Sequence, residues 1–151
     1  MEYGKELVDI TPDKSLMLIL GYTGYSISEA IAELVDNAID ERIDGKLLTV
    51  RVNVLPTSIS VEDDAKGMTK DVAKDALILG KSTKINKPSL GLYGLGLKTA
   101  CASLGRRYSI STKTMEEGRR YILEFDENKW LNNPEATWHN FPIHWVLAPT
   151  D

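Results

Sequence analysis

The chain has 151 residues, of which 42% are hydrophobic and 26% charged, and its formal net charge is −4. This is the size and composition of one soluble globular domain, and it is not comfortably enough for two. The acidic balance argues against a domain that grips nucleic acid through a basic surface. Cys101 is the single cysteine, which excludes an internal disulfide framework and predicts a buried thiol.

Nothing in the composition points to secretion or to a membrane. The N-terminal stretch MEYGKELVDITPDK is polar and mixed in charge, unlike a signal peptide. No apolar run approaches membrane-spanning length. We therefore expect no membrane contact and a reducing, cytoplasmic setting.

The first predicted elements are a helix and a hairpin. Apolar residues recur at three- and four-residue steps over 26–43, which predicts an amphipathic helix. Two stretches that alternate in polarity follow at 50–54 and 59–61. Turn residues at 56–58 join them, so the sequence predicts two antiparallel strands here.

Two further helices are predicted in the middle of the chain. Residues 69–79 form the first, with Thr69 as its N-cap and Gly80 at its end. A polar loop at 81–90 separates it from the second helix, predicted at 96–104.

The last third of the chain predicts a second hairpin. Strands at 106–113 and 119–126 surround a turn at Glu117–Gly118, a loop follows at 128–140, and 141–147 predicts a final strand. The order of elements indicates a two-layer α+β sandwich, with helices on one face of a mainly antiparallel mixed sheet.

The first candidate functional pattern is ELVDNAID, within the predicted helix 26–43. Glu33, Asn37 and Asp40 are spaced i, i+4 and i+7, so they form a stripe along the edge of the apolar face. Such a stripe is often a solvated polar face. An aligned carboxylate and amide in mid-helix could instead hold Mg²⁺ and a water, since oxygen ligands suit that ion.

The second pattern is SVEDDAKGM, at the end of the first hairpin. By strand parity Asp63 points to the same side as Ile59 and Val61, which is the expected buried side. A charge there is costly without a partner. Either the strand has ended and the carboxylate caps a turn, or Asp63 accepts a hydrogen bond from a ligand amino group at a pocket floor.

The third pattern is GLYGLGLKTA, residues 91–100. Its glycines allow a backbone to approach a ligand closely, and a helix that begins after such a turn attracts phosphate. The stretch is either a phosphate cradle or a flexible turn before a helix. The polar residues 81–89 upstream are expected to form a mobile lid.

These three patterns, in this order, resemble the nucleotide-binding boxes of the superfamily of gyrase B subunit, heat-shock chaperone, histidine kinase and MutL, the GHKL or Bergerat-fold ATPases. The resemblance covers residues 15–113. Within the superfamily, GYSISEAIAELVDNAID and GLYGLGLKTA look most like the MORC and MORC-like bacterial proteins. The resemblance implies the Bergerat fold and one ATP-binding domain over 1–151, the N-terminal part of a longer protein.

The resemblance also implies roles for the residues of the first box. Glu33 matches the general base that activates the attacking water. Asn37 matches the protein ligand of Mg²⁺. Asp40 would support that site without contacting the ion.

In the second box, Asp63 matches the carboxylate that reads the adenine amino group. Gly67 and Met68 match the backbone and the apolar wall of the adenine pocket.

The third box matches the phosphate-binding turn and lid of the family. Ser82 and Thr83 lie where the family has its ATP lid, and Lys98 either reaches phosphate or turns away. The cradle itself corresponds to Gly91, Leu92, Tyr93, Gly94, Leu95, Gly96 and Leu97.

Two departures from the family pattern stand out. Ala65 replaces the usual first glycine of the second box, at a cost of about 1 kcal/mol if that backbone needs a positive φ. The final box, a threonine on a late strand after a glycine, has no convincing match in SISTK at 109–113. The following domain, which sends a cation to the terminal phosphate, is absent, so we expect this chain to be a fragment.

The predicted function is Mg²⁺-dependent binding of ATP or ADP and slow ATP hydrolysis by the nucleotide-binding domain of a chaperone-, MutL- or MORC-like machine. The expected partners are adenine nucleotide, the following domains and, in the full-length protein, a second copy in an ATP-dependent homodimer. The alternatives are the ATP-binding half of a histidine kinase, against which Glu33 argues, and a nucleotide-binding switch without useful turnover.

Two other groups of residues suggest no further function. His139 and His144 fit no common zinc spacing and are interpreted as structural. The Arg pairs at 106–107 and 119–120 are interpreted as strand starts on a solvated face, with DNA contact as the alternative.

Overall fold

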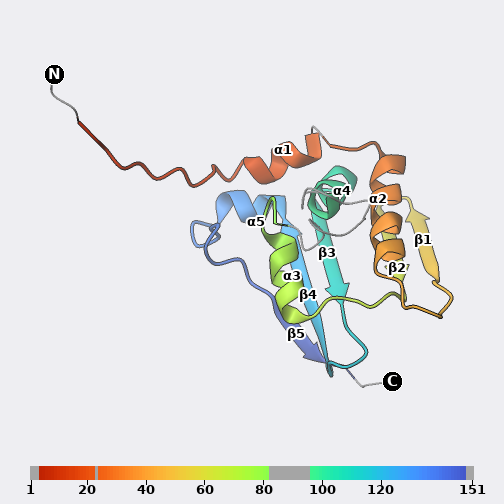
Figure 1. Cartoon of the computed structure of the whole chain (residues 1–151). Helices are drawn as coiled ribbons and strands as arrows, with labels where there is room; N and C mark the ends of the chain where they lie inside the picture. Colours follow the sequence, from red (N-terminus) through yellow and green to blue (C-terminus); the bar gives the residue numbers. More distant parts are fainter. Residues whose placement is uncertain (1–3, 23, 82–95, 149–151) are drawn as a thin grey trace.

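The computed structural model of the chain describes residues 4–22, 24–81 and 96–148. Figure 1 shows the order of its helices and strands. The described residues form α1 (Leu16–Tyr22), α2 (Ile27–Asp40), β1 (Val50–Leu55), β2 (Ser58–Asp63), α3 (Lys70–Leu77), α4 (Gly96–Leu104), β3 (Arg107–Thr112), β4 (Arg119–Asp126), α5 (Glu127–Asn132) and β5 (His144–Leu147).

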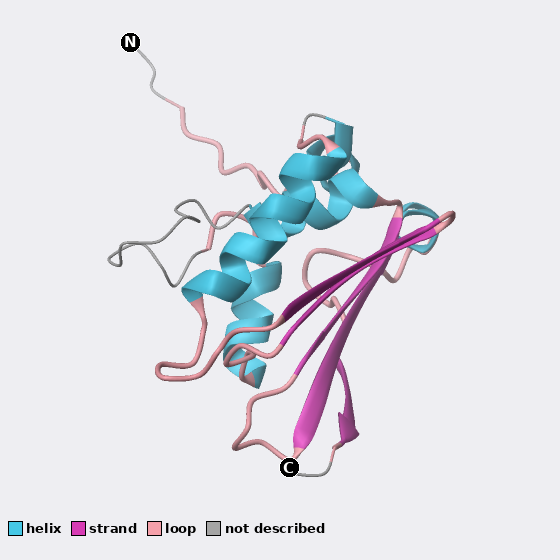
Figure 2. Cartoon of the chain, turned by 90° about the vertical axis from the view of Figure 1, so that its right-hand side faces the viewer, coloured by secondary structure: helices cyan, strands magenta, loops and turns pink. Residues whose placement is uncertain are grey.

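The elements form two layers, with helices on one side of the strands (Figure 2). The predicted α+β architecture is therefore confirmed. β1 and β2 form one antiparallel pair, and β3, β4 and β5 form an antiparallel sheet in that order. Within the described residues no ladder joins β2 to β3, so the strands there make two sheets. In the same part of the chain, no helix is long and apolar enough to cross a bilayer.

α2 begins with a complete capping box. The Ser26 hydroxyl accepts from the Glu29 amide at 3.2 Å, and the Glu29 carboxylate accepts from the Ser26 amide at 2.9 Å. This reciprocal capping box fixes where the helix begins. The helix ends at Asp40, three residues before the predicted end.

Small residues let the helices pack closely. Ala30 and Ala38 of α2 and Ala100 of α4 are buried. A β-carbon on Gly21 of α1 would lie 2.5 Å from the carbonyl oxygen of Ala102, so that glycine is needed for α1 to reach α4. This close contact holds α4 between α1 and α2.

The aromatic core is formed by residues of the C-terminal half of the chain together with Met17 of α1. Met17, Phe125 and Trp130 are buried together, and Tyr108 stacks on Phe125 with ring centroids 5.2 Å apart. The main chain of Lys14 accepts a hydrogen bond from the Trp130 indole at 2.9 Å, while the Lys14 ammonium donates to the Trp130 carbonyl at 3.0 Å. These two hydrogen bonds therefore connect the residues just before α1 to α5.

Two helices depart from the sequence prediction. α1 was not predicted, and α5 occupies part of the segment 128–140 that the Asn and Pro residues predicted as a loop. The prediction of a loop was wrong there because the Asp126 side chain caps the helix, accepting from the Lys129 amide at 3.0 Å. Burial of Trp130 then stabilises the short helix against the core.

The remaining elements agree with the prediction to within a few residues. Thr69 caps α3, accepting from the Val72 amide at 3.3 Å, and Gly80 has a φ of 79° after the helix. Cys101 is buried, and burial raises the pKa of its thiol to about 11. The free cysteine is therefore a packing residue.

Candidate functional site

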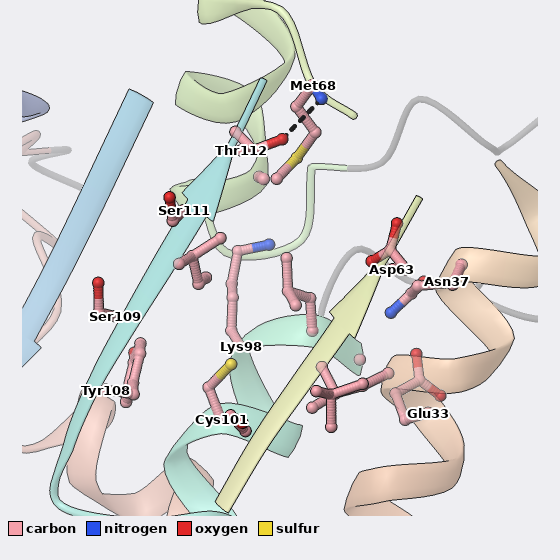
Figure 3. A pocket seen from close by; sticks show the side chains of 18 of the residues that line it. Glu33, Asn37, Asp63, Met68, Lys98, Cys101, Tyr108, Ser109, Ser111 and Thr112 are labelled. Atoms are coloured by element: carbon pink, nitrogen blue, oxygen red, sulfur yellow. Dashed lines mark hydrogen bonds between the residues drawn. The ribbon is translucent and has the colours of Figure 1, made fainter. Parts of the chain in front are cut away.

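A cavity of about 1210 Å³ lies between α2, α3 and α4 on the helical side and the edges of β2 and β3 (Figure 3). Its wall includes Ile59 and Val61 from one face of β2 and Ser58 and Ser60 from the other. Because successive strand residues point to opposite faces, the cavity must run along the edge of β2. Its volume is ample for a ligand the size of a nucleotide.

α2 contributes two of the predicted residues to this cavity. Glu33 and Asn37 both line it, and Asn37 lies beside Asp63 in Figure 3. Asp40, one turn further on, is half-buried and lies outside the wall that the described residues form. The structure thus brings together two of the three residues of the stripe.

Asp63, the last residue of β2, lines the cavity, but it is exposed where its parity predicts burial. Its carboxylate oxygen accepts a hydrogen bond from the Ala65 amide at 3.0 Å. The two alternatives for Asp63 are therefore compatible, because a carboxylate that stabilises its own turn keeps acceptor capacity for a ligand.

The turn after β2 is held from two sides. Asp64 accepts from the Thr49 amide at 2.8 Å and pairs with Lys46 at 3.4 Å, and these contacts hold the pKa of Asp64 below its usual value, the Thr49 hydrogen bond first. The Lys66 amide donates to the Glu41 carbonyl just after α2, at 2.9 Å. These contacts fix the turn on which Asp63 stands.

Ala65 causes no backbone strain. Among the described residues, only glycines have a positive φ, so the replacement of the usual glycine costs nothing of that kind. The glycine that the turn does require is Gly67, with a φ of 71°. A β-carbon there would collide with the Lys113 carbonyl oxygen.

Thr112 is a site residue that the sequence did not reveal. It is buried on β3, lines the cavity, and its hydroxyl accepts from the Met68 amide at 2.8 Å (Figure 3). The segment SISTK, at 109–113, does not match the final box of the resembled family convincingly. No local signal could identify Thr112, because its partner is 44 residues away in the sequence.

Gly96 begins α4 and packs against Glu33. A β-carbon at Gly96 would collide with the Glu33 carboxylate. Its φ is not in the left-handed region, so the close approach of Glu33 is the contact that distinguishes this glycine, and a larger residue would displace the Glu33 carboxylate. The carboxylate of Glu33 thus lies at the N-terminus of a nine-residue helix, where negative charge is favourable.

Several predicted residues fall outside the described part of the chain. These are the lid residues Ser82 and Thr83 and, from the glycine turn, Gly91, Leu92, Tyr93, Gly94 and Leu95. Of that turn, Gly96 and Leu97 are described, and both line the cavity.

Tyr25 is a second neighbour of Glu33 that sequence reasoning missed. Burial raises the pKa of Tyr25, and the negative charges of Glu33 and Glu29 raise it further. The Tyr25 amide donates to the Ser103 hydroxyl of α4 at 3.0 Å. This bond ties the start of α2 to α4 beside the cavity.

Metal-binding chemistry in the described residues is sparse. No group of three or more His, Cys, Asp or Glu side chains there could hold a metal ion. His139 and His144 are both exposed and lie away from the cavity wall. Asn37 of the cavity wall stays the predicted protein ligand of a cation there.

Comparisons with known proteins found a matching family model and several relatives. A family model described as "Histidine kinase-, DNA gyrase B-, and HSP90-like ATPase" matches residues 25–145. Protein MICRORCHIDIA 3 of Arabidopsis thaliana is 33% identical over 95 residues, covering 60% of this chain and 16% of that protein. MORC family CW-type zinc finger protein 3 of Mus musculus is 34% identical over 92 residues, covering 58% of this chain and 10% of that protein. ATPase morc-1 of Caenorhabditis elegans is 37% identical over 86 residues, covering 56% of this chain and 10% of that protein. The chain therefore corresponds to a small part of these relatives.

Proposed function

Because the chain belongs to the family of histidine kinase-, DNA gyrase B- and HSP90-like ATPases, we propose that it binds ATP or ADP with Mg²⁺ in the cavity and hydrolyses ATP slowly. In this proposal residues 1–151 are the ATP-binding domain of a longer, ATP-gated, MORC-like protein. The observation that carries it is the arrangement of Glu33, Asn37 and Asp63 with the N-terminus of α4 around one cavity.

Asp63 recognises the base. Its carboxylate accepts a hydrogen bond from the adenine amino group and repels the carbonyl oxygen that guanine has in its place. Gly67 and Met68 form the adjoining wall, and the bond from the Met68 amide to Thr112 holds that wall against β3.

Asn37 and the start of α4 bind the metal and the phosphates. The donor set fits Mg²⁺, because the described wall of the cavity offers the Asn37 amide oxygen and no acidic cluster there that could hold a metal alone, and this ion is usually held by few protein ligands with water and phosphate oxygens. The ion would supply charge neutralisation at the phosphates. Gly96 and Leu97, in the first turn of α4, line the same side of the cavity, and the amides of a first turn have no partner within the helix.

Glu33 acts on the attacking water. Its carboxylate lines the cavity beside Gly96, at the end of α4 where phosphate is expected, so it accepts a proton from a water there. Phosphoanhydride hydrolysis needs little else from the protein beyond positioning and charge stabilisation. Glu33 also argues against the histidine-kinase alternative, because kinases of the superfamily generally lack this carboxylate.

The partners beyond the nucleotide belong to the longer protein. We expect the following domains of the same protein to complete the site, and ATP to promote a homodimer. The relatives are many times longer than this chain, which supports the view of one domain in a larger machine.

Calorimetry with ADP, in excess Mg²⁺ and in EDTA, tests the proposal. We expect binding in Mg²⁺ that weakens strongly in EDTA. Asn37→Ala should lose most of the metal-dependent part while keeping the wild-type circular dichroism spectrum. Equal affinity in the two buffers would remove Asn37 and the metal from the proposal, and no binding at all would refute the nucleotide site.

A further inference from the structure

Lys98 lies in an unusual position for a lysine. Its side chain is only 6% exposed, and it extends from the first turn of α4 into the cavity between β2 and β3 (Figure 3). Lysines are almost never this deeply buried without a reason, because their charged form is poorly solvated there. Burial lowers the pKa of Lys98 to about 8.

Side chains on every element around the cavity set the electrostatic surroundings of this amine. α2 contributes Glu33, the residue after it is Glu41, β2 contributes Asp63, and α3 contributes Asp75. These four carboxyl groups are the acidic side chains that the described wall of the cavity carries besides the thiol and the phenol.

Two other acids of the wall have raised pKa values. Burial raises the pKa of Cys101 on α4 to about 11 and raises that of Tyr108 on β3 still further. The cationic side chains are Lys66, Lys81, Arg106 and Arg107. Of the three groups Lys98, Cys101 and Tyr108, Lys98 is the one whose pKa burial moves toward neutral pH.

We propose that Lys98 couples nucleotide binding to proton uptake, so that the nucleotide is bound tightly only when the buried amine carries its proton. This inference rests on the proposed function. The phosphates bring negative charge into the same poorly solvated cavity, which stabilises the ammonium over the neutral amine. Lys98 thereby acts as a cationic contact for the nucleotide and makes the affinity of the site depend on pH.

The sign and size of the effect follow from linkage. Below pH 7.5 the amine is already protonated in the free protein, so this group adds little pH dependence. Above pH 8 the free protein loses the proton and the complex keeps it, so affinity falls with rising pH. With a pKa of about 8 in the free protein, the affinity at pH 9 should be about tenfold lower than at pH 7.

The proton itself can be counted. Calorimetry with ADP and Mg²⁺, in two buffers of different ionisation enthalpy, gives the number of protons taken up on binding. We expect about 0.1 proton at pH 7 and about 0.9 at pH 9. The range from pH 7 to pH 9 lies above the pKa of the nucleotide's own terminal phosphate, about 6, so that phosphate adds little to the proton count.

Two variants and a matched control locate the proton. Lys98→Met keeps the length of the side chain but should abolish proton uptake and weaken binding at pH 7. Lys98→Arg should bind with no step between pH 7 and 9, because its charge does not titrate there. Lys81→Met is the control: this lysine lines the same cavity but is exposed and pairs with Asp75 at 2.8 Å, so the step should remain.

The outcomes separate this inference from the proposed function. If the wild-type protein binds ADP at pH 7 but takes up fewer than about 0.3 protons at pH 9, or if the step survives in Lys98→Met, the inference is wrong and the nucleotide site stands. If the wild-type protein does not bind ADP at pH 7, the proposed function fails and this inference with it. The wild-type proton count decides even if Lys98→Met does not fold.

Discussion

Gly67→Ala should destabilise the domain and damage the wall of the cavity beside Asp63. Gly67 has a φ of 71°, which an alanine adopts at a cost of about 1–2 kcal/mol. The new β-carbon would also collide with the Lys113 carbonyl oxygen and lie 2.7 Å from the adjacent carbonyl carbon. Both atoms are backbone, so the turn or the end of β3 must move, at a further cost of about 1–3 kcal/mol.

Gly45→Ala is the matched control for that change. Gly45 has a φ of 75°, but a β-carbon there would have no atom within 4 Å. It therefore carries the same conformational penalty without the collision, and its net loss should be near 1 kcal/mol. The difference between the two variants isolates the contact between the turn and Lys113.

Urea denaturation followed by circular dichroism measures both losses. With a slope of about 2 kcal/mol per molar urea, we expect midpoints lower by about 0.5 M for Gly45→Ala and by about 1.5 M for Gly67→Ala. Gly67→Ala should also weaken ADP binding, because the Met68 amide that bonds Thr112 is the next residue. Equal midpoints for the two variants would refute the argument that the backbone contact at Lys113 requires glycine.

Two further substitutions separate recognition of the base from hydrolysis. Asp63→Asn keeps an oxygen for the Ala65 amide, so the turn should persist while ATP affinity falls by about 1–3 kcal/mol. Calorimetry with ATP and GTP measures this change. An unchanged preference for ATP would contradict the role of Asp63. Glu33→Ala should keep ATP binding and lose about 10²- to 10⁴-fold in turnover, measured as phosphate release by the longer protein; hydrolysis at the wild-type rate would remove Glu33 from the mechanism and favour a binding switch.

The sequence predicted those parts of the fold whose signals are local. The capping box of Ser26 and Glu29 and the apolar periodicity after it specify α2 without help from the rest of the chain. α5 could not be predicted, because its six residues depend on Trp130 reaching the core formed with Met17. A short helix of this kind is stabilised by tertiary packing and leaves little periodic signal.

The candidate site likewise contains some residues that the sequence could predict and others that it could not. The spacing of Glu33 and Asn37 is a property of one helix, so the sequence could predict that these two side chains share a face, and both line the cavity. Thr112 and the direction of Lys98 depend on how β3 and α4 are set against β2, which no local pattern encodes. The close approach of Gly96 to the Glu33 carboxylate likewise joins two elements that are far apart in the sequence.

The reciprocal pair of hydrogen bonds between Lys14 and Trp130 bears on how the domain folds. These bonds join residues 116 positions apart. Closing a flexible loop of that length costs about 4 kcal/mol in chain entropy, whereas the β3–β4 hairpin closes over a few residues. The hairpins and α2 should therefore form first and shorten the effective loop, and the contact between α1 and α5 should form late. Since Met17 and Trp130 belong to the same buried cluster, the packing of these two side chains would then form last, after the Tyr108–Phe125 pair of the β3–β4 hairpin.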